Sequence, residues 1–281
     1  CVLINDGETN WEHVAVSISG KSFKESSAFI DSIPGYASFS VKGLELGLNH
    51  TLLINMTEAL DDDFSLTIKI GDRLIHQEDC TIHIMPFDQW TGVKIRPELT
   101  ASFVTPNHPL ISKVAVAASK FLEQWTNDCA LDGYLSKDIE RVRYQIAAVY
   151  EALRCENIVY TVPPASFESY GQRIRTIEKV LTEKLGTCID LSLLFASCLE
   201  SIGIFPIIIL TQNHCYLGAW LRPECYSSVV GDDATFLQKA ISNGINEIVV
   251  IEATSITSSS SVGFEESVAL ATTKLNTDPD F

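Results

Sequence analysis

Long hydrophobic runs, positive charge and closely spaced cysteine pairs are all scarce in this 281-residue chain. The longest apolar run, residues 204–210, has the length of a strand and contains Pro206, so we expect no membrane-spanning helix. The chain carries 20 Lys and Arg against 36 Asp and Glu, which gives a formal net charge of −16. Because an acidic surface repels phosphate groups, we expect no direct contact between this segment and nucleic acid.

The eight cysteines contain no Cys-x-x-Cys pair of the kind that holds structural zinc. Cys155 and Cys198 lie in helical patterns, where cysteine acts as a small hydrophobic residue. With no signal peptide at the start, these features favour a reduced, cytoplasmic protein, and we expect neither a metal ion nor another cofactor. The sequence begins at Cys1 without a methionine, and we expect it to be a piece of a longer polypeptide.

Residues 1–92 have the pattern of an antiparallel immunoglobulin-like β-sandwich. Apolar and polar residues alternate in short segments that are separated by Gly, Asp, Asn and Pro. The dipeptide Gly71-Asp72 predicts a hairpin turn between two of these segments. No reactive side chains gather here, so we expect a scaffold or an interaction module. The expected strands are 12–18, 36–41, 51–55, 64–70, 73–76 and 81–85.

Residues 93–281 change to a mixed pattern of helices and strands, which predicts a separate α+β domain. Ser136 and Thr176 are candidate N-caps of two helices, and Gly203 ends a third. Two consecutive prolines exclude a helix from the loop 161–170. The expected helices are 110–125, 136–154, 176–185, 188–202 and 234–242, with a last helical pattern after the serines at 258–261. The expected strands are 205–211, 215–221 and 247–252.

One of these predicted helices begins at a cysteine. Thr187 is a suitable N-cap, Cys188 takes the first helical position, and Asp190 takes the third, where a capping-box acid lies. Free backbone N–H groups and the positive end of the helix dipole favour a reactive thiolate at such a position, although Asp190 opposes this effect. Cys188 also falls on the apolar stripe of the helix, so we expect its sulfur to point toward the sheet.

A nucleophilic cysteine needs a base, and the base needs an orienting group. His214 opens the second strand after the cysteine helix, and Glu252 ends the strand that follows. We therefore interpret Cys188 as the nucleophile, His214 as the base and Glu252 as the carboxylate that orients the base. Taken singly, each has an ordinary structural interpretation, as a buried cysteine, a packed histidine and a solvated or paired glutamate.

This order of residues resembles the transglutaminase-like branch of the papain-like superfamily. The matching segments lie within residues 176–254 and are 186–190 (GTCID), 213–214 (NH), 218–220 (GAW) and 251–254 (IEAT). The resemblance implies a cysteine peptidase or acyl hydrolase in which a helical part packs on a small antiparallel sheet. The acid of this family is commonly Asp, whereas this chain has Glu252.

Three further segments, at 103–109, 163–167 and 172–175, resemble one bacterial subgroup of this family. In that subgroup a β-sandwich and a transglutaminase-like module precede helicase and nuclease regions in one very long chain. The resemblance covers nearly all of the sequence. It implies that the partners are a protein or peptide substrate and further domains of the same chain.

Several residues near the predicted triad are secondary candidates. Gln172 and Asp190 are candidates for contact with the oxyanion or the substrate, beside the backbone N–H of Cys188. The resemblance to papain-like enzymes suggests the role of Gln172. Arg173 and Arg175 either bind a substrate carboxylate or provide ordinary surface charge.

Two alternatives that involve Cys215 are disfavoured by the sequence. Because side chains alternate along a strand, we expect Cys215 to face away from His214, which excludes it as the nucleophile. A zinc site formed by Cys188, His214, Cys215 and Cys225 lacks the usual ligand spacing.

Two functions remain open at this point. The first is a cysteine protease or transglutaminase-like acyl hydrolase that acts on a peptide, isopeptide or amide carbonyl. The second is a catalytically idle domain of the same fold that serves as an interaction module of a larger helicase and nuclease protein.

Overall fold

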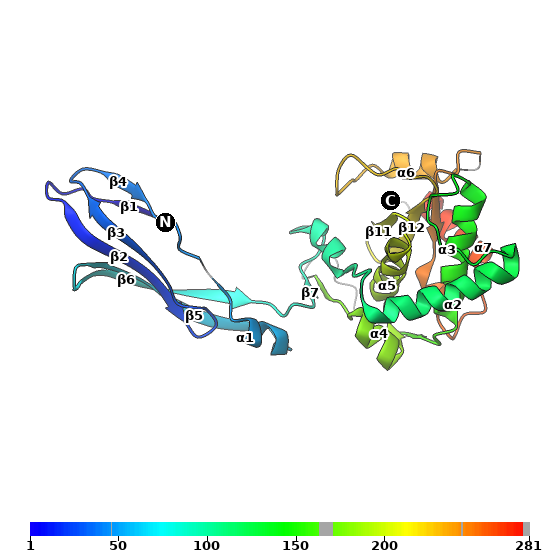
Figure 1. Ribbon diagram of the computed structural model, residues 1–281, viewed down its shortest axis with the longest axis horizontal. Helices are drawn as coiled ribbons and strands as arrows, with labels where there is room; N and C mark the ends of the chain where they lie inside the picture. The colour runs from blue at the N-terminus through cyan, green and yellow to red at the C-terminus, as the bar shows by residue number, and fades with distance from the viewer. Residues whose placement is uncertain (46, 163–170, 243, 278–281) are drawn as a thin grey trace. The chain divides into compact units, whose positions relative to one another are not determined.

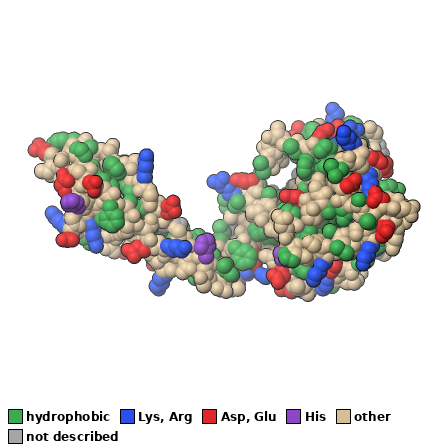
Figure 2. Space-filling view, in the orientation of Figure 1, with side chains coloured by type: hydrophobic (Ala, Val, Ile, Leu, Met, Phe, Trp, Pro, Cys, Tyr) green, Lys and Arg blue, Asp and Glu red, His purple; other side chains and the backbone are tan. Residues whose placement is uncertain are grey.

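The computed structural model describes residues 1–45, 47–162, 171–242 and 244–277. The chain divides into two compact units, Cys1–Phe87 and Asp88–Phe281, a few residues before the boundary expected at 92/93. The architecture is mixed α and β, as predicted, and the sheets are antiparallel apart from one short parallel pair. On the face shown in Figure 2, Asp and Glu side chains are scattered over both units among Lys and Arg.

The first unit is built on a four-stranded antiparallel sheet in the order β3-β2-β5-β6 (Figure 1). A separate pair, β1-β4, contributes Leu3 to a core that includes Val14 and Val16 of β2 and Ile30 of β3. The elements are β1 (Val2–Ile4), β2 (Trp11–Gly20), β3 (Ser26–Ile33), β4 (Ser38–Ser40), α1 (His50–Asn55), β5 (Leu60–Ile70) and β6 (Arg73–Ile84).

The predicted hairpin in this unit is confirmed, one predicted strand is a helix, and two others form a single strand. Ile70 pairs with Arg73 across Gly71-Asp72, and Gly71 has the positive φ of 56° that such a turn requires. Residues 51–55 were expected to form a strand but belong to helix α1, whose start is capped by the Asn49 side chain. The expected strands 73–76 and 81–85 are one continuous strand, β6, because β5 pairs with its full length.

The second unit places helices beside a three-stranded antiparallel sheet in the order β11-β12-β13 (Figure 1). Helix α5 packs against β11 and β12, and α2 and α3 pack against α5. The elements are β7 (Gln89–Trp90), the 3₁₀ helix η1 (Pro97–Phe103), α2 (Pro109–Thr126), α3 (Ile139–Arg154), β8 (Val159–Tyr160), β9 (Gln172–Arg173), α4 (Ile177–Glu183), β10 (Leu185–Gly186), α5 (Cys188–Ser201), β11 (Pro206–Leu210), β12 (Cys215–Trp220), α6 (Ala234–Ala240), β13 (Ile248–Ile251), the 3₁₀ helix η2 (Ala253–Ile256) and α7 (Phe264–Thr277).

Helix α5 is the central element of this unit. All of its residues from Cys188 to Leu199 are buried, because the sheet covers one side and the other helices cover the rest. Phe195 of α5 lies 6.3 Å from Tyr150 of α3, measured between ring centroids. The helix that begins at Cys188 is therefore fixed by packing over all but its last two residues.

The helix limits largely follow the sequence prediction. Thr176 caps α4 as expected, but α3 is capped by Asp138 and not by Ser136, whose hydroxyl instead accepts a hydrogen bond from the Asp138 backbone. Cys198 is buried, whereas Cys155 ends α3 and is exposed, so its place in the helical pattern does not reflect packing.

Most of the predicted loop 161–170 lies outside the described residues. Among the helices that are described, none combines the length and the apolar character needed to cross a membrane.

Candidate active site

Cys188 is the first residue of α5, at the position that the sequence predicted. The Thr187 side chain accepts a hydrogen bond from the backbone of Asp190, and Asp190 accepts one from the backbone of Thr187 at 3.0 Å, which completes a capping box. Cys188, a residue only 4% exposed, therefore lies at a helix start, where the first backbone N–H groups have no partner within the helix.

His214 and Glu252 lie at the ends of two neighbouring strands. His214 lies in the turn just before β12, where its carbonyl accepts a hydrogen bond from the Thr211 backbone at 2.9 Å. Glu252 immediately follows β13, which pairs with β12 in antiparallel register. The Nε2 atom of His214 lies 2.8 Å from Oε1 of Glu252, so the other ring nitrogen, Nδ1, remains for Cys188.

Interactions within the site favour the charged forms of His214 and Glu252. Burial alone would lower the pKa of His214, but hydrogen bonds and charge interactions with Cys188 and Glu252 outweigh it and raise this pKa to about 9. Burial likewise would raise the pKa of Glu252, but its partners, His214 first among them, lower it to about 2. The arrangement therefore favours a protonated imidazolium between a carboxylate and the sulfur.

Glu252 has partners that the sequence analysis missed. Its Oε1 atom accepts a hydrogen bond from the Thr254 hydroxyl at 2.7 Å, and its Oε2 atom lies 2.9 Å from Nζ of Lys274 in α7. The hydroxyl of Ser267, also in α7, donates to the Glu252 carbonyl at 3.1 Å. These contacts fix the carboxylate in a site where only 4% of its side chain is exposed. Thr254 is close enough in sequence to have been found, but Ser267 and Lys274 had no such signal.

Tyr160 is a second group that the sequence analysis missed. Strand β8 pairs with β10 so that Tyr160 lies opposite Gly186, two residues before Cys188. Its side chain packs on the buried cluster that contains Cys188, and the interaction with Cys188 helps to raise the pKa of its hydroxyl. Burial, followed by the charges of Cys188 and Glu252, raises the pKa of Tyr160 to about 12.

The secondary candidates serve mainly to build the start of α5. Asp190 is 1% exposed and accepts hydrogen bonds from the backbones of Thr187 and Arg175. Because these bonds and the Arg175 guanidinium occupy its carboxylate, Asp190 has a capping role and not one in contact with substrate. The amide of Gln172 donates to the Thr187 hydroxyl at 3.4 Å, and its buried carbonyl oxygen has no hydrogen-bond partner among the described residues.

The two arginines beside Gln172 bind carboxylates of this chain. Arg173 lies 3.2 Å from Asp88, and Arg175 lies 3.3 Å from Asp190. Both Asp88 and Asp190 are nearly inaccessible to solvent, so the guanidinium groups compensate buried negative charge. Neither arginine is therefore a free clamp for a substrate carboxylate.

Cys215 lies on the opposite side of the backbone from His214, as the sequence predicted. The rings of His214 and Tyr216, two residues apart, share one face with centroids 4.5 Å apart, whereas Cys215 joins the buried cluster that contains Cys188. Cys215 is fully buried, and burial raises the pKa of its thiol well above the usual value. Its thiol is therefore protonated and a poor nucleophile.

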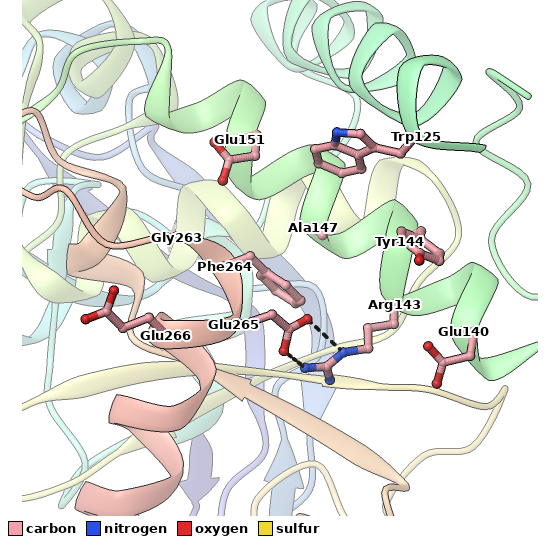
Figure 3. A pocket seen from close by; sticks show the side chains of 10 residues that line it. All are labelled: Trp125, Glu140, Arg143, Tyr144, Ala147, Glu151, Gly263, Phe264, Glu265 and Glu266. Carbon is pink, nitrogen blue, oxygen red and sulfur yellow. Dashed lines mark hydrogen bonds and ion pairs between the residues drawn. The ribbon is translucent and has the colours of Figure 1, made fainter. Parts of the chain in front are cut away.

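A pocket of about 540 Å³ lies elsewhere in the second unit (Figure 3). Trp125 of α2 and Tyr144 of α3 line it, and Arg143 reaches across to form an ion pair with Glu265 of α7. Arg143 also lies 5.3 Å from the centroid of the Phe264 ring. None of the three triad residues lines this pocket.

No protein-family model, curated protein or solved structure matches the chain. Among the described residues there is no group of three or more His, Cys, Asp or Glu side chains that could hold a metal ion. The site itself brings together a histidine and a buried carboxylate, beside a cysteine at a helix start.

Proposed function

We propose that the second unit is a transglutaminase-like cysteine hydrolase that attacks a peptide, isopeptide or amide carbonyl. In this proposal Cys188 is the nucleophile, His214 the acid and base, and Glu252 the orienting carboxylate. The first unit is an immunoglobulin-like sandwich, and both belong to a longer chain with helicase and nuclease regions. The observation that carries the proposal is the 2.8 Å contact between His214 and Glu252, beside a cysteine at the start of α5.

The reaction follows from the positions of these groups. The Cys188 thiolate attacks the carbonyl carbon, a C–S bond forms, and an electron pair moves onto the carbonyl oxygen. When the C–N bond breaks, His214 gives its proton to the leaving amine. A water molecule then attacks the acyl-enzyme, His214 takes its proton, and the C–S bond breaks to restore the thiolate. Glu252 remains ionised throughout, because its pKa of about 2 lies far below the working pH.

The first test is the alkylation of the intact protein by iodoacetamide at pH 6, followed by mass spectrometry of each cysteine peptide. The exposed Cys129 provides an internal reference thiol. A thiolate paired with His214 is expected to react at least about 10-fold faster than Cys129 at this pH, because ordinary thiols are almost fully protonated there. His214→Ala is expected to abolish the difference, whereas His76→Ala, an exposed histidine of the first unit, is expected to preserve it.

One observation favours a second function. Cys188 is only 4% exposed, which is unusual for a nucleophile that must reach a macromolecular substrate. In this alternative the fold is retained without catalysis, and the domain acts as an interaction module. Equal alkylation rates for Cys188 and Cys129, unaffected by His214→Ala, would exclude the hydrolase and support this alternative.

A further inference from the structure

We propose that Tyr160 is a further catalytic residue, whose hydroxyl donates a hydrogen bond first to the Cys188 sulfur and then to the oxyanion that forms when this sulfur attacks. The inference rests on the proposed hydrolase function. It assigns a side-chain oxyanion donor to a residue that no sequence pattern indicated.

The backbone fixes Tyr160 beside the nucleophile. Tyr160 is paired with Gly186 in the parallel β8-β10 ladder, and the next residue, Thr161, donates to the Gly186 carbonyl at 3.0 Å. Gly186 is joined to Cys188 through the N-cap Thr187, so the β8-β10 pairing fixes Tyr160 near the start of α5. The tyrosine side chain packs on the buried cluster that contains Cys188, which places it near the sulfur.

The protonation state of Tyr160 suits a donor. Burial and the negative charges of Cys188 and Glu252 keep the phenol protonated, with a pKa of about 12. A phenol O–H that touches the sulfur is also close to any oxygen on a carbon bonded to that sulfur. It therefore can transfer its hydrogen bond from the thiolate to the oxyanion without losing its proton, while backbone N–H groups at the start of α5 supply a second donor.

The other candidate for this role is less well placed. Gln172 directs its amide N–H to the Thr187 hydroxyl, so this donor already has an acceptor in the helix cap. Tyr160, in contrast, donates no hydrogen bond to the described residues of the helix cap, and the proposal gives its hydroxyl the Cys188 sulfur as acceptor.

Two probes separate the hydrogen bond to the oxyanion from the hydrogen bond to the thiolate. Iodoacetamide alkylates a thiolate without forming an oxyanion, whereas para-nitrophenyl acetate acylates it through one. In Tyr160→Phe, which keeps the ring and its packing, we expect the rate of Cys188 acylation to fall by about 10²-fold. Above the pH midpoint of alkylation the iodoacetamide rate is expected to match the wild type.

The control variant is Tyr144→Phe, which removes the hydroxyl of a half-exposed tyrosine on α3. An acylation rate in Tyr160→Phe equal to that of Tyr144→Phe would overturn the inference, as would an equal fall with both probes above the midpoint. Neither of these two results would contradict the hydrolase proposal. If wild-type Cys188 reacts no faster than Cys129 with iodoacetamide, the hydrolase proposal itself fails, and the role of Tyr160 fails with it.

Discussion

Glu252 is the residue on which most of the site converges. The transglutaminase-like family proposed for this chain commonly has Asp in the acid position, and Glu252 has a longer side chain. Here one carboxylate oxygen reaches His214 at 2.8 Å while the other reaches Lys274 at 2.9 Å. Glu252 therefore connects the turn before β12 with helix α7. Its hydrogen bonds with Thr254 fix the carboxylate that holds these two connections.

The interaction of His214 with Glu252 should make stability depend on pH. The folded pKa of His214, about 9, lies above its ordinary value of 6.5, so this contribution is complete below pH 6.5 and is lost as the pH rises through 9. The folded pKa of Glu252, about 2, lies below its ordinary value of 4.5, so its contribution is complete above pH 4.5 and is lost as the pH falls through 2.

We therefore expect Glu252→Gln to lower the free energy of unfolding most between pH 4.5 and 6.5, where both contributions are complete. Urea unfolding at about pH 5.5 and again above about pH 9 would measure the difference from the wild type, which should shrink at the higher pH. Glu200→Gln, at an exposed position near the end of α5, is the matched control. A difference that is the same at both pH values would contradict the ion pair.

At the scale of the element, the start of α5 depends on its capping box. Thr187 is fully buried. Its hydroxyl oxygen accepts one hydrogen bond from the Asp190 backbone and a second from the Gln172 side-chain amide. Removal of this hydroxyl would leave buried N–H groups without an acceptor at the position of the nucleophile.

Thr187→Ala should therefore destabilise the second unit by about 1 to 2 kcal/mol, the upper part of the range for an N-cap. Thr187→Ser keeps the hydroxyl and should lose much less. Urea unfolding followed by circular dichroism measures both variants. Equal losses in Ala and Ser would show that the methyl group, and not the cap, provides the stabilisation.

At the scale of the whole molecule, the hydrophobic cores separate the two units. Among the described residues, every buried cluster lies wholly within one unit, on one side of the division after Phe87. The triad and Tyr160 all lie in the second unit. Each unit therefore has its own core, as an independently folding domain does.

We expect a fragment of residues 88–281 to fold alone and to keep the alkylation rate of Cys188. Its thermal unfolding midpoint should match one of two transitions in the full chain, because its core clusters contain no residue of the first unit. Calorimetry of the fragment and the full chain, with iodoacetamide labelling of both, is the measurement. A fragment that aggregates or loses its reactive cysteine would show that the two units depend on each other.

The sequence by itself determined the features that depend on near neighbours. The capping box at Thr187 and the turn at Gly71-Asp72 depend on contacts within a few residues, so the chain pattern identified both. A short apolar segment, in contrast, did not distinguish a strand from a helix. Residues 51–55 fit a strand by alternation, but a single bond from the Asn49 side chain marks them as a helix.

Tertiary structure alone decided which distant groups complete the site. Tyr160 and Lys274 reach the triad from β8 and α7, elements that are separated from Cys188 by other helices and strands. Their contacts depend on strand pairing and on packing against α5, and no local pattern encodes these. An isolated polar residue does not reveal from the sequence which distant residue it will contact. The fold decides which residues meet, whatever their separation along the chain.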